Sequence, residues 1–152
     1  MIFLIFLCLI IGLFSKISDY IREDAIEYAK KYCDHYNDDY SYLSNKDTEP
    51  INFVSQCLFA GGQSFSGCRG KNMYGMIYIY NDLTTCLYKK GWKFSETKND
   101  KIKEGYPALI KGSRKLVIIT GFKDNKVIYC GHKKICNKEL DQDLLAYFYL
   151  DE

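Results

Sequence analysis

The sequence has 152 residues, a formal net charge of +2 and 16% aromatic residues, most of them the 14 tyrosines. This length suits one domain with a buried core. The small net charge, the scattered lysines and arginines and the absence of a nucleic-acid-binding motif argue against a nucleic-acid partner.

The chain begins with an unbroken apolar run from Met1 to Phe14. This run is too short to cross a bilayer core of about 30 Å comfortably. It is typical of the hydrophobic region of a signal peptide, and small residues at Ser15 and Ser18 offer cleavage points. We therefore expect residues 1–18 to be a signal peptide and residues 19–152 to be one secreted domain, without a stable membrane span after signal removal. An uncleaved anchor or a buried first helix is the alternative.

Cysteine usage points to the same oxidising compartment. Of seven cysteines, Cys8 lies in the signal, which leaves Cys33, Cys57, Cys68, Cys86, Cys130 and Cys136. An even number in an exported chain of this size predicts disulfides, although sequence alone does not choose the pairing. Cys130 and Cys136 are close enough in sequence to close a small loop. No Cys-x-x-Cys pair exists, so we expect neither a zinc ribbon nor a thioredoxin-like site, and no metal or cofactor.

The first predicted helix begins at Ser18, a possible N-cap, and continues to about Tyr36. Its apolar residues recur every three or four positions, as expected for an amphipathic helix. His35, at its end, is expected to interact with the helix dipole rather than with a metal or substrate. A polar loop then leads to the next helix.

The central helix is predicted over residues 48–60, with Thr48 as N-cap and Pro50 in the first turn. Its interior is apolar except for Asn52, Ser55 and Gln56, which indicates a helix enclosed by other elements. Gly61 and Gly62 end it. A glycine-containing surface loop follows over residues 61–70, without the phosphate-binding pattern of nucleotide-binding loops.

A third helix is predicted over residues 81–90, capped by Asn81 or Asp82, and Trp92 after it is expected in the core. The periodicity then changes to that of strands: residues 106–110, a hairpin of residues 116–120 and 126–130, and residues 144–150. Helices followed by strands predict an α+β fold with an antiparallel sheet.

The central helix also carries a family resemblance. Asn52-Phe53-Val54-Ser55-Gln56-Cys57-Leu58, followed by Ala60-Gly61-Gly62, resembles the putative amidase domain of secreted proteins, a family grouped with papain-like and CHAP-like cysteine hydrolases. The resemblance covers roughly residues 25–150. It implies a papain-like or CHAP-like α+β fold, in which N-terminal helices precede a C-terminal antiparallel sheet and the central helix packs on that sheet.

The resemblance also implies which positions would carry catalysis. In the family an Asp-Cys-Thr triplet precedes the helix motif and supplies the nucleophile; here the triplet is Glu49-Pro50-Ile51. The family's catalytic His lies just before the first hairpin strand, where this chain has Lys115. His132, after the second hairpin strand, matches a further His that the family often has.

These replacements would remove the family chemistry. Pro50 has neither a nucleophilic atom nor an N–H for an oxyanion, and an ordinary lysine such as Lys115 is charged at neutral pH and is no base. In a protease, loss of the nucleophile costs on the order of 10⁶ in turnover. The leading hypothesis is therefore a catalytically inactive secreted domain that binds a peptide or glycan in the inherited groove, with Asn52, Gln56 and His132 as candidate binding residues.

Two alternatives remain open. Cys57 lies two helical turns beyond Pro50 on the same face, and hairpin pairing places His132 near Lys115, so a shifted Cys57–His132 pair would make an active cysteine amidase or peptidase. Burial would instead make Cys57 a packed or bridged residue. The other alternative is a disulfide-stapled secreted protein that is unrelated to amidases.

Overall fold

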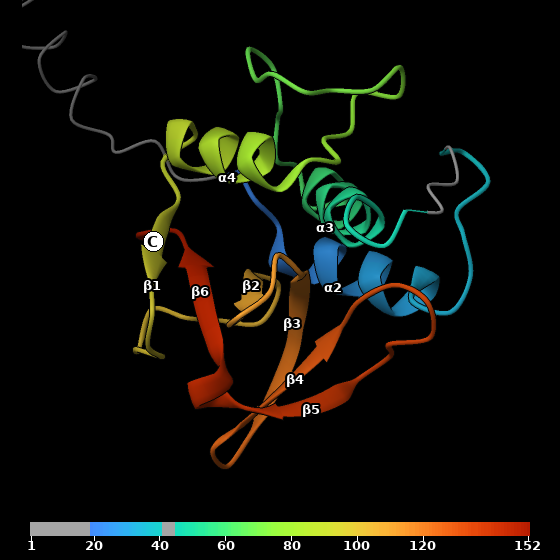
Figure 1. The fold of residues 1–152 in the computed structure, drawn as a ribbon. Helices are drawn as coiled ribbons and strands as arrows, with labels where there is room; N and C mark the ends of the chain where they lie inside the picture. Colours follow the sequence, from blue (N-terminus) through green and yellow to red (C-terminus); the bar gives the residue numbers. More distant parts are fainter. Residues whose placement is uncertain (1–18, 41–44) are drawn as a thin grey trace, which may run out of the picture.

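The computed structural model describes residues 19–40 and 45–152. Three helices, α2 (Arg22–Tyr32), α3 (Glu49–Ala60) and α4 (Tyr80–Lys89), precede the sheet in the described part of the chain. The strands are β1 (Lys93–Ser95), β2 (Pro107–Ile110), β3 (Leu116–Lys123), β4 (Lys126–Cys130), β5 (Lys138–Asp141) and β6 (Leu145–Tyr149), with a 3-10 turn at Gln142–Leu144. Figure 1 shows the helices gathered on one side of the sheet. The predicted α+β fold is confirmed.

All strand pairs are antiparallel, and the strand order is β1-β6-β2-β3-β4-β5. The predicted hairpin is β3 and β4, and its turn places Asp124 at a positive φ of 53°. Side chains of β3 alternate between the sheet's two faces. Leu116 and Ile118 enter the core shared with the helices, whereas Val117 and Ile119 enter a second apolar cluster.

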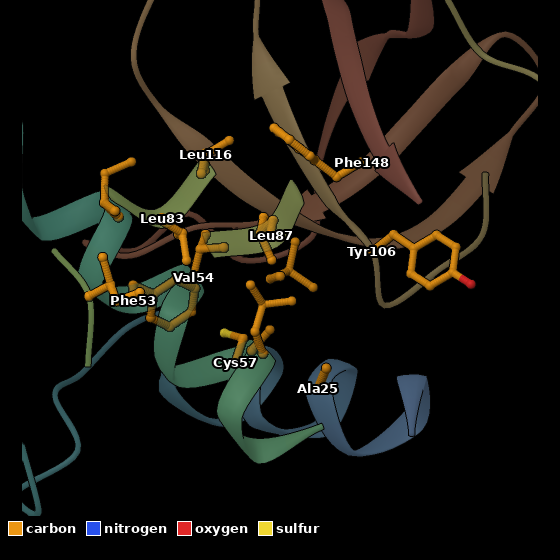
Figure 2. Close-up of a cluster of buried hydrophobic side chains, with 14 of the residues drawn as sticks. Ala25, Phe53, Val54, Cys57, Leu83, Leu87, Tyr106, Leu116 and Phe148 are labelled. Atoms are coloured by element: carbon orange, nitrogen blue, oxygen red, sulfur yellow. The ribbon is translucent and has the colours of Figure 1, made fainter. Parts of the chain in front are cut away.

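The central helix is enclosed, as its composition predicts. Nine of its twelve residues are buried, and α3 contacts α2, β3 and α4. Figure 2 shows Val54 and Cys57 of α3 directed into a core that also holds Leu87 and Phe148. Burying a large apolar side chain of this kind stabilises the fold by about 1.5–3 kcal/mol.

The ends of α3 agree with the sequence only in part. At the C-terminal end, Gly62 takes a φ of +91°, and the N–H of Gln63 donates to the Leu58 carbonyl at 2.9 Å. This is the left-handed helix ending that glycine favours. At the N-terminal end, Thr48 already has helical backbone angles and its side chain makes no capping hydrogen bond. Thr48 therefore occupies the predicted N-cap position but does not cap the helix through its side chain.

Other element boundaries also differ from the predictions. The first helix ends at Tyr32 rather than Tyr36. The N-cap of α4 is Ile79, so neither Asn81 nor Asp82 caps it. Strands β1 and β5 were not predicted. Ser18 and the predicted signal peptide lie outside the described residues.

The cysteines form fewer bridges than their even number suggests. Disulfides join Cys33 to Cys136 and Cys68 to Cys86, whereas Cys57 and Cys130 are buried free thiols. Cys130 does not pair with Cys136 because the loop after β4 turns towards the end of α2, where the N–H of Lys134 donates to the Cys33 carbonyl at 2.8 Å. The prediction of disulfides is confirmed for four cysteines only.

Within the described residues, no helix combines the length and the apolar character that crossing a membrane requires. Trp92 is buried, as predicted, and its indole N–H donates to the Gln63 side chain at 2.7 Å.

Candidate functional site

Three positions that the sequence singles out meet at one cavity. Pro50, Lys115 and His132 all line a hollow of about 130 Å³ between the N-terminal end of α3, the start of β3 and the loop after β4. The remaining lining residues are Lys46, Glu49, Ile110, Leu116, Val117, Gly131, Lys133 and Ile135. The hairpin register, which pairs Ile118 with Cys130, carries His132 back towards the start of β3.

A buried ion pair occupies one wall of this cavity. The Glu49 carboxylate contacts Nδ1 of His132, and both side chains are about 95% buried. A buried carboxylate needs a charged or hydrogen-bonding partner to offset its lost hydration. Glu49 is the first residue of α3, so the positive end of the helix dipole also favours its charge.

The second ring nitrogen of His132 is engaged as well. Nε2 lies 3.2 Å from the carbonyl oxygen of His35, and because a carbonyl only accepts, Nε2 carries a proton and donates. The Phe53 ring stacks on the imidazole, and the Tyr36 ring meets it edge-on. Both nitrogens of His132 therefore face protein oxygens, and the ring is held in place from several sides.

Cys57 lies in the core rather than at the cavity. Its side chain is completely buried among apolar residues, as Figure 2 shows, and it does not line the hollow that contains His132. Burial raises the pKa of the Cys57 thiol well above its usual value, and the neighbouring Cys130 adds to the shift. At neutral pH this thiol is protonated, which is the inert form of a cysteine.

Asn52 and Gln56 belong to a buried network between helices. Gln56 donates to the Asn52 side-chain oxygen at 2.6 Å, and the Tyr28 hydroxyl donates to Gln56 at 2.7 Å. Asn37 donates in turn to the Tyr28 hydroxyl at 3.1 Å. Burial is the main cause that raises the pKa of Tyr28. This network joins α2 to α3, and neither Asn52 nor Gln56 lines the cavity.

Sequence reasoning missed Glu49 as the partner of His132, and it also missed Lys46 and Lys133 at the cavity. The available signal for Glu49 was an acidic residue directly beside Pro50 in a helix otherwise built for burial. Nothing in the sequence indicated that Lys133 lies at the cavity, because its position depends on how the loop after β4 folds back. Among the described residues, no group of three or more His, Cys, Asp or Glu side chains is arranged to hold a metal ion.

Comparison with known protein families finds a match. Residues 19–128 match the model of a family described as a putative amidase domain. The matched range contains α2, α3, α4 and the first hairpin strand, and so includes Pro50 and Lys115, whereas His132 lies beyond it. Searches of curated proteins and of solved structures found no match.

Proposed function

Because the chain belongs to the putative amidase domain family, we propose that it is a secreted, catalytically inactive amidase-like domain that binds a peptide or glycan at the N-terminal end of α3. The observation that carries the proposal is the cavity lined together by Pro50 and Lys115. These are the positions that, by resemblance, would hold the family's nucleophile and base. The binding surface would thus be retained while the reacting groups are lost.

The chemistry of the two replacements supports inactivity. Hydrolysis of an amide by a cysteine nucleophile needs a thiolate, a base and an N–H group that stabilises the oxyanion. Pro50 supplies neither a sulfur nor an N–H at the start of α3. Lys115 is exposed, and an ordinary lysine at neutral pH carries its proton and accepts none.

The surroundings of His132 and Cys57, the two residues left that could carry catalysis, also support inactivity. His132 donates from Nε2 to a backbone carbonyl and meets Glu49 through Nδ1, so no ring nitrogen is free to take a substrate proton. Cys57 lies in the core with a raised pKa. A shifted Cys57–His132 site would require both residues to leave these contacts.

The proposal also includes a papain-like or CHAP-like fold and secretion. A central helix packed on an antiparallel sheet suits the papain-like or CHAP-like architecture that the resemblance implies. Two disulfides and the apolar N-terminal run are consistent with a signal peptide and secretion.

The test is turnover by the purified, secreted protein on peptide amide and N-acyl amino acid substrates, measured beside the Cys57→Ser variant. We expect no hydrolysis above the buffer blank for either protein. Hydrolysis by the unaltered chain that disappears in Cys57→Ser would overturn the proposal. That outcome would favour the active cysteine hydrolase, for which the one supporting observation is that Cys57 is not in a disulfide.

A further inference from the structure

The cavity at the N-terminal end of α3 carries an excess of positive charge. Lys46, Lys115 and Lys133 line it, all exposed, and none of the three ammonium groups forms an ion pair with a described residue. The one acidic side chain in the lining, Glu49, is already paired with His132. The positive end of the α3 dipole adds to the same potential.

Some lysines elsewhere on the molecule do form ion pairs. Lys93 and Lys101 both pair with Asp151, and Lys103 pairs with Glu152. Other exposed lysines, such as Lys138, also form no ion pair with a described residue, so what distinguishes the three at the cavity is that they surround one apolar hollow.

The backbone conformation of the turn after β4 fixes the position of Lys133 at the cavity. The φ of Lys133 is +60° and that of Lys134 is +69°. Both lie in the left-handed region, which costs a lysine on the order of 1 kcal/mol. Two hydrogen bonds fix this turn: Gly131 N–H donates to the Ile135 carbonyl at 2.8 Å, and Lys134 N–H donates to Cys33. The Cys33–Cys136 disulfide ties the turn to α2.

The other walls of the cavity are apolar: Pro50, Ile110, Leu116, Val117 and Ile135. The hollow has a volume of about 130 Å³ and a mainly apolar lining. This lining favours an apolar group over a sugar ring with its hydroxyls, because hydroxyls buried there would lack hydrogen-bond partners. An anionic group at the rim would meet the lysines while an apolar group fills the hollow.

From this combination we propose that the cavity binds a peptide carboxylate carried beside an apolar side chain. The inference rests on the proposed binding function and specifies its ligand. Carboxylate oxygens would accept hydrogen bonds from the lysine ammonium groups, and charged pairs of this kind are stronger than neutral ones. A peptide C-terminus and an acidic side chain next to an apolar residue both supply this chemistry.

The test uses the secreted protein and three probes: acetyl-Gly-Gly-Leu with a free C-terminal carboxylate, the same peptide as its amide, and acetyl-Gly-Glu-Leu-amide. Binding is followed by ligand-observed NMR titration. We expect the free carboxylate to bind at least about five-fold more tightly than the simple amide, and the preference to weaken with added salt. Binding of the glutamate peptide would identify an acidic side chain as a sufficient source of the carboxylate.

Lysine variants test whether the peptide binds at the cavity. Lys115→Gln with Lys133→Gln should remove most of the carboxylate preference, whereas Lys138→Gln, an exposed lysine of β5 outside the cavity, should leave it unchanged. The replaced side chains are exposed, and matching circular dichroism melts would verify that the double variant folds.

The outcomes distinguish loss of the carboxylate assignment from loss of the binding function itself. Equal binding of the carboxylate and the simple amide would overturn the carboxylate assignment and leave peptide binding intact. Binding of an N-acetylglucosamine trimer without any peptide would overturn it in favour of a glycan. If the protein binds neither the three peptides nor the trimer, the inference falls and the proposed binding function loses its support.

Discussion

At the residue scale, the pairing of Glu49 with His132 is the feature that sequence reasoning could least supply. Glu49 stands next to the position expected to hold a nucleophile, and His132 lies 83 positions later in the chain, so their contact exists only after the hairpin has folded. Lys115 and His132 could be placed near each other from hairpin pairing, whereas only the family resemblance placed Pro50 with them. Which group His132 would contact depended on burial, which no local pattern encodes.

The buried pair should be costly to break. Replacing one partner leaves the other charge buried without compensation, which typically costs about 3–5 kcal/mol. We expect Glu49→Gln to lower the free energy of unfolding by an amount near the lower end of that range, since glutamine can still hydrogen-bond to the imidazole. Urea unfolding measures the change.

The matched control is Glu27→Gln, an exposed acid of α2, which should change stability by less than about 0.5 kcal/mol. If Glu49→Gln is as mild as this control, the ion pair contributes little and His132 is held by its ring contacts alone.

The free thiols give a second prediction at this scale. Burial raises the pKa of both Cys57 and Cys130, and a raised pKa means less thiolate at any pH below it. Iodoacetamide reacts with thiolate, so labelling of the native protein near neutral pH should be much slower than that of an ordinary cysteine, whose pKa is about 8.5.

Peptide mass spectrometry without reductant should find these two cysteines labelled only after unfolding, and the four bridged cysteines unlabelled throughout. Rapid labelling of Cys57 in the native protein at neutral pH would contradict its inert state and reopen the shifted active site.

At the element scale, the helices and the hairpin could be predicted because each carries its own signal. The alternation of apolar residues, the glycines after α3 and the β-branched runs of β3 and β4 are all local. Strands β1 and β5 carry no such signal: β1 has three residues, and β5 reads Lys-Glu-Leu-Asp at a sheet edge. Their extended form depends on pairing with β6 and β4, which lie elsewhere in the chain.

The packing of α2 on α3 depends partly on the Tyr28 hydroxyl, which links Asn37 to Gln56. Tyr28→Phe keeps the ring but leaves the Gln56 oxygen without its donor in a buried place. We expect a loss of about 1–3 kcal/mol in the free energy of unfolding, the usual cost of an unsatisfied buried acceptor.

Tyr88→Phe on α4, where the tyrosine is half exposed, is the control and should be nearly neutral. Thermal or urea unfolding compares the two. Equal stability of both variants would show that water replaces the hydroxyl and that the network contributes little.

At the scale of the whole molecule, the two disulfides act over very different lengths of chain. Cys68–Cys86 spans 18 residues and closes a local loop ahead of and within α4, whereas Cys33–Cys136 spans 103 residues and ties the end of α2 to the loop after β4. The longer bridge also borders the cavity, because its loop contains His132 and Lys133. Stability and the binding surface are therefore linked through one covalent bond.

Removing the bridges one at a time tests this link. In the chain-entropy description a bridge over about 100 residues stabilises by about 4.7 kcal/mol and one over about 15 residues by about 3 kcal/mol. We expect the Cys33→Ser, Cys136→Ser double variant to lose roughly 1–2 kcal/mol more stability in urea unfolding than the Cys68→Ser, Cys86→Ser variant. The first pair should also weaken carboxylate binding, because Lys133 loses the restraint on its turn, while the second pair leaves binding unchanged. If both variants bind equally well and unfold at the same urea concentration, the long bridge neither dominates stability nor holds the cavity in shape.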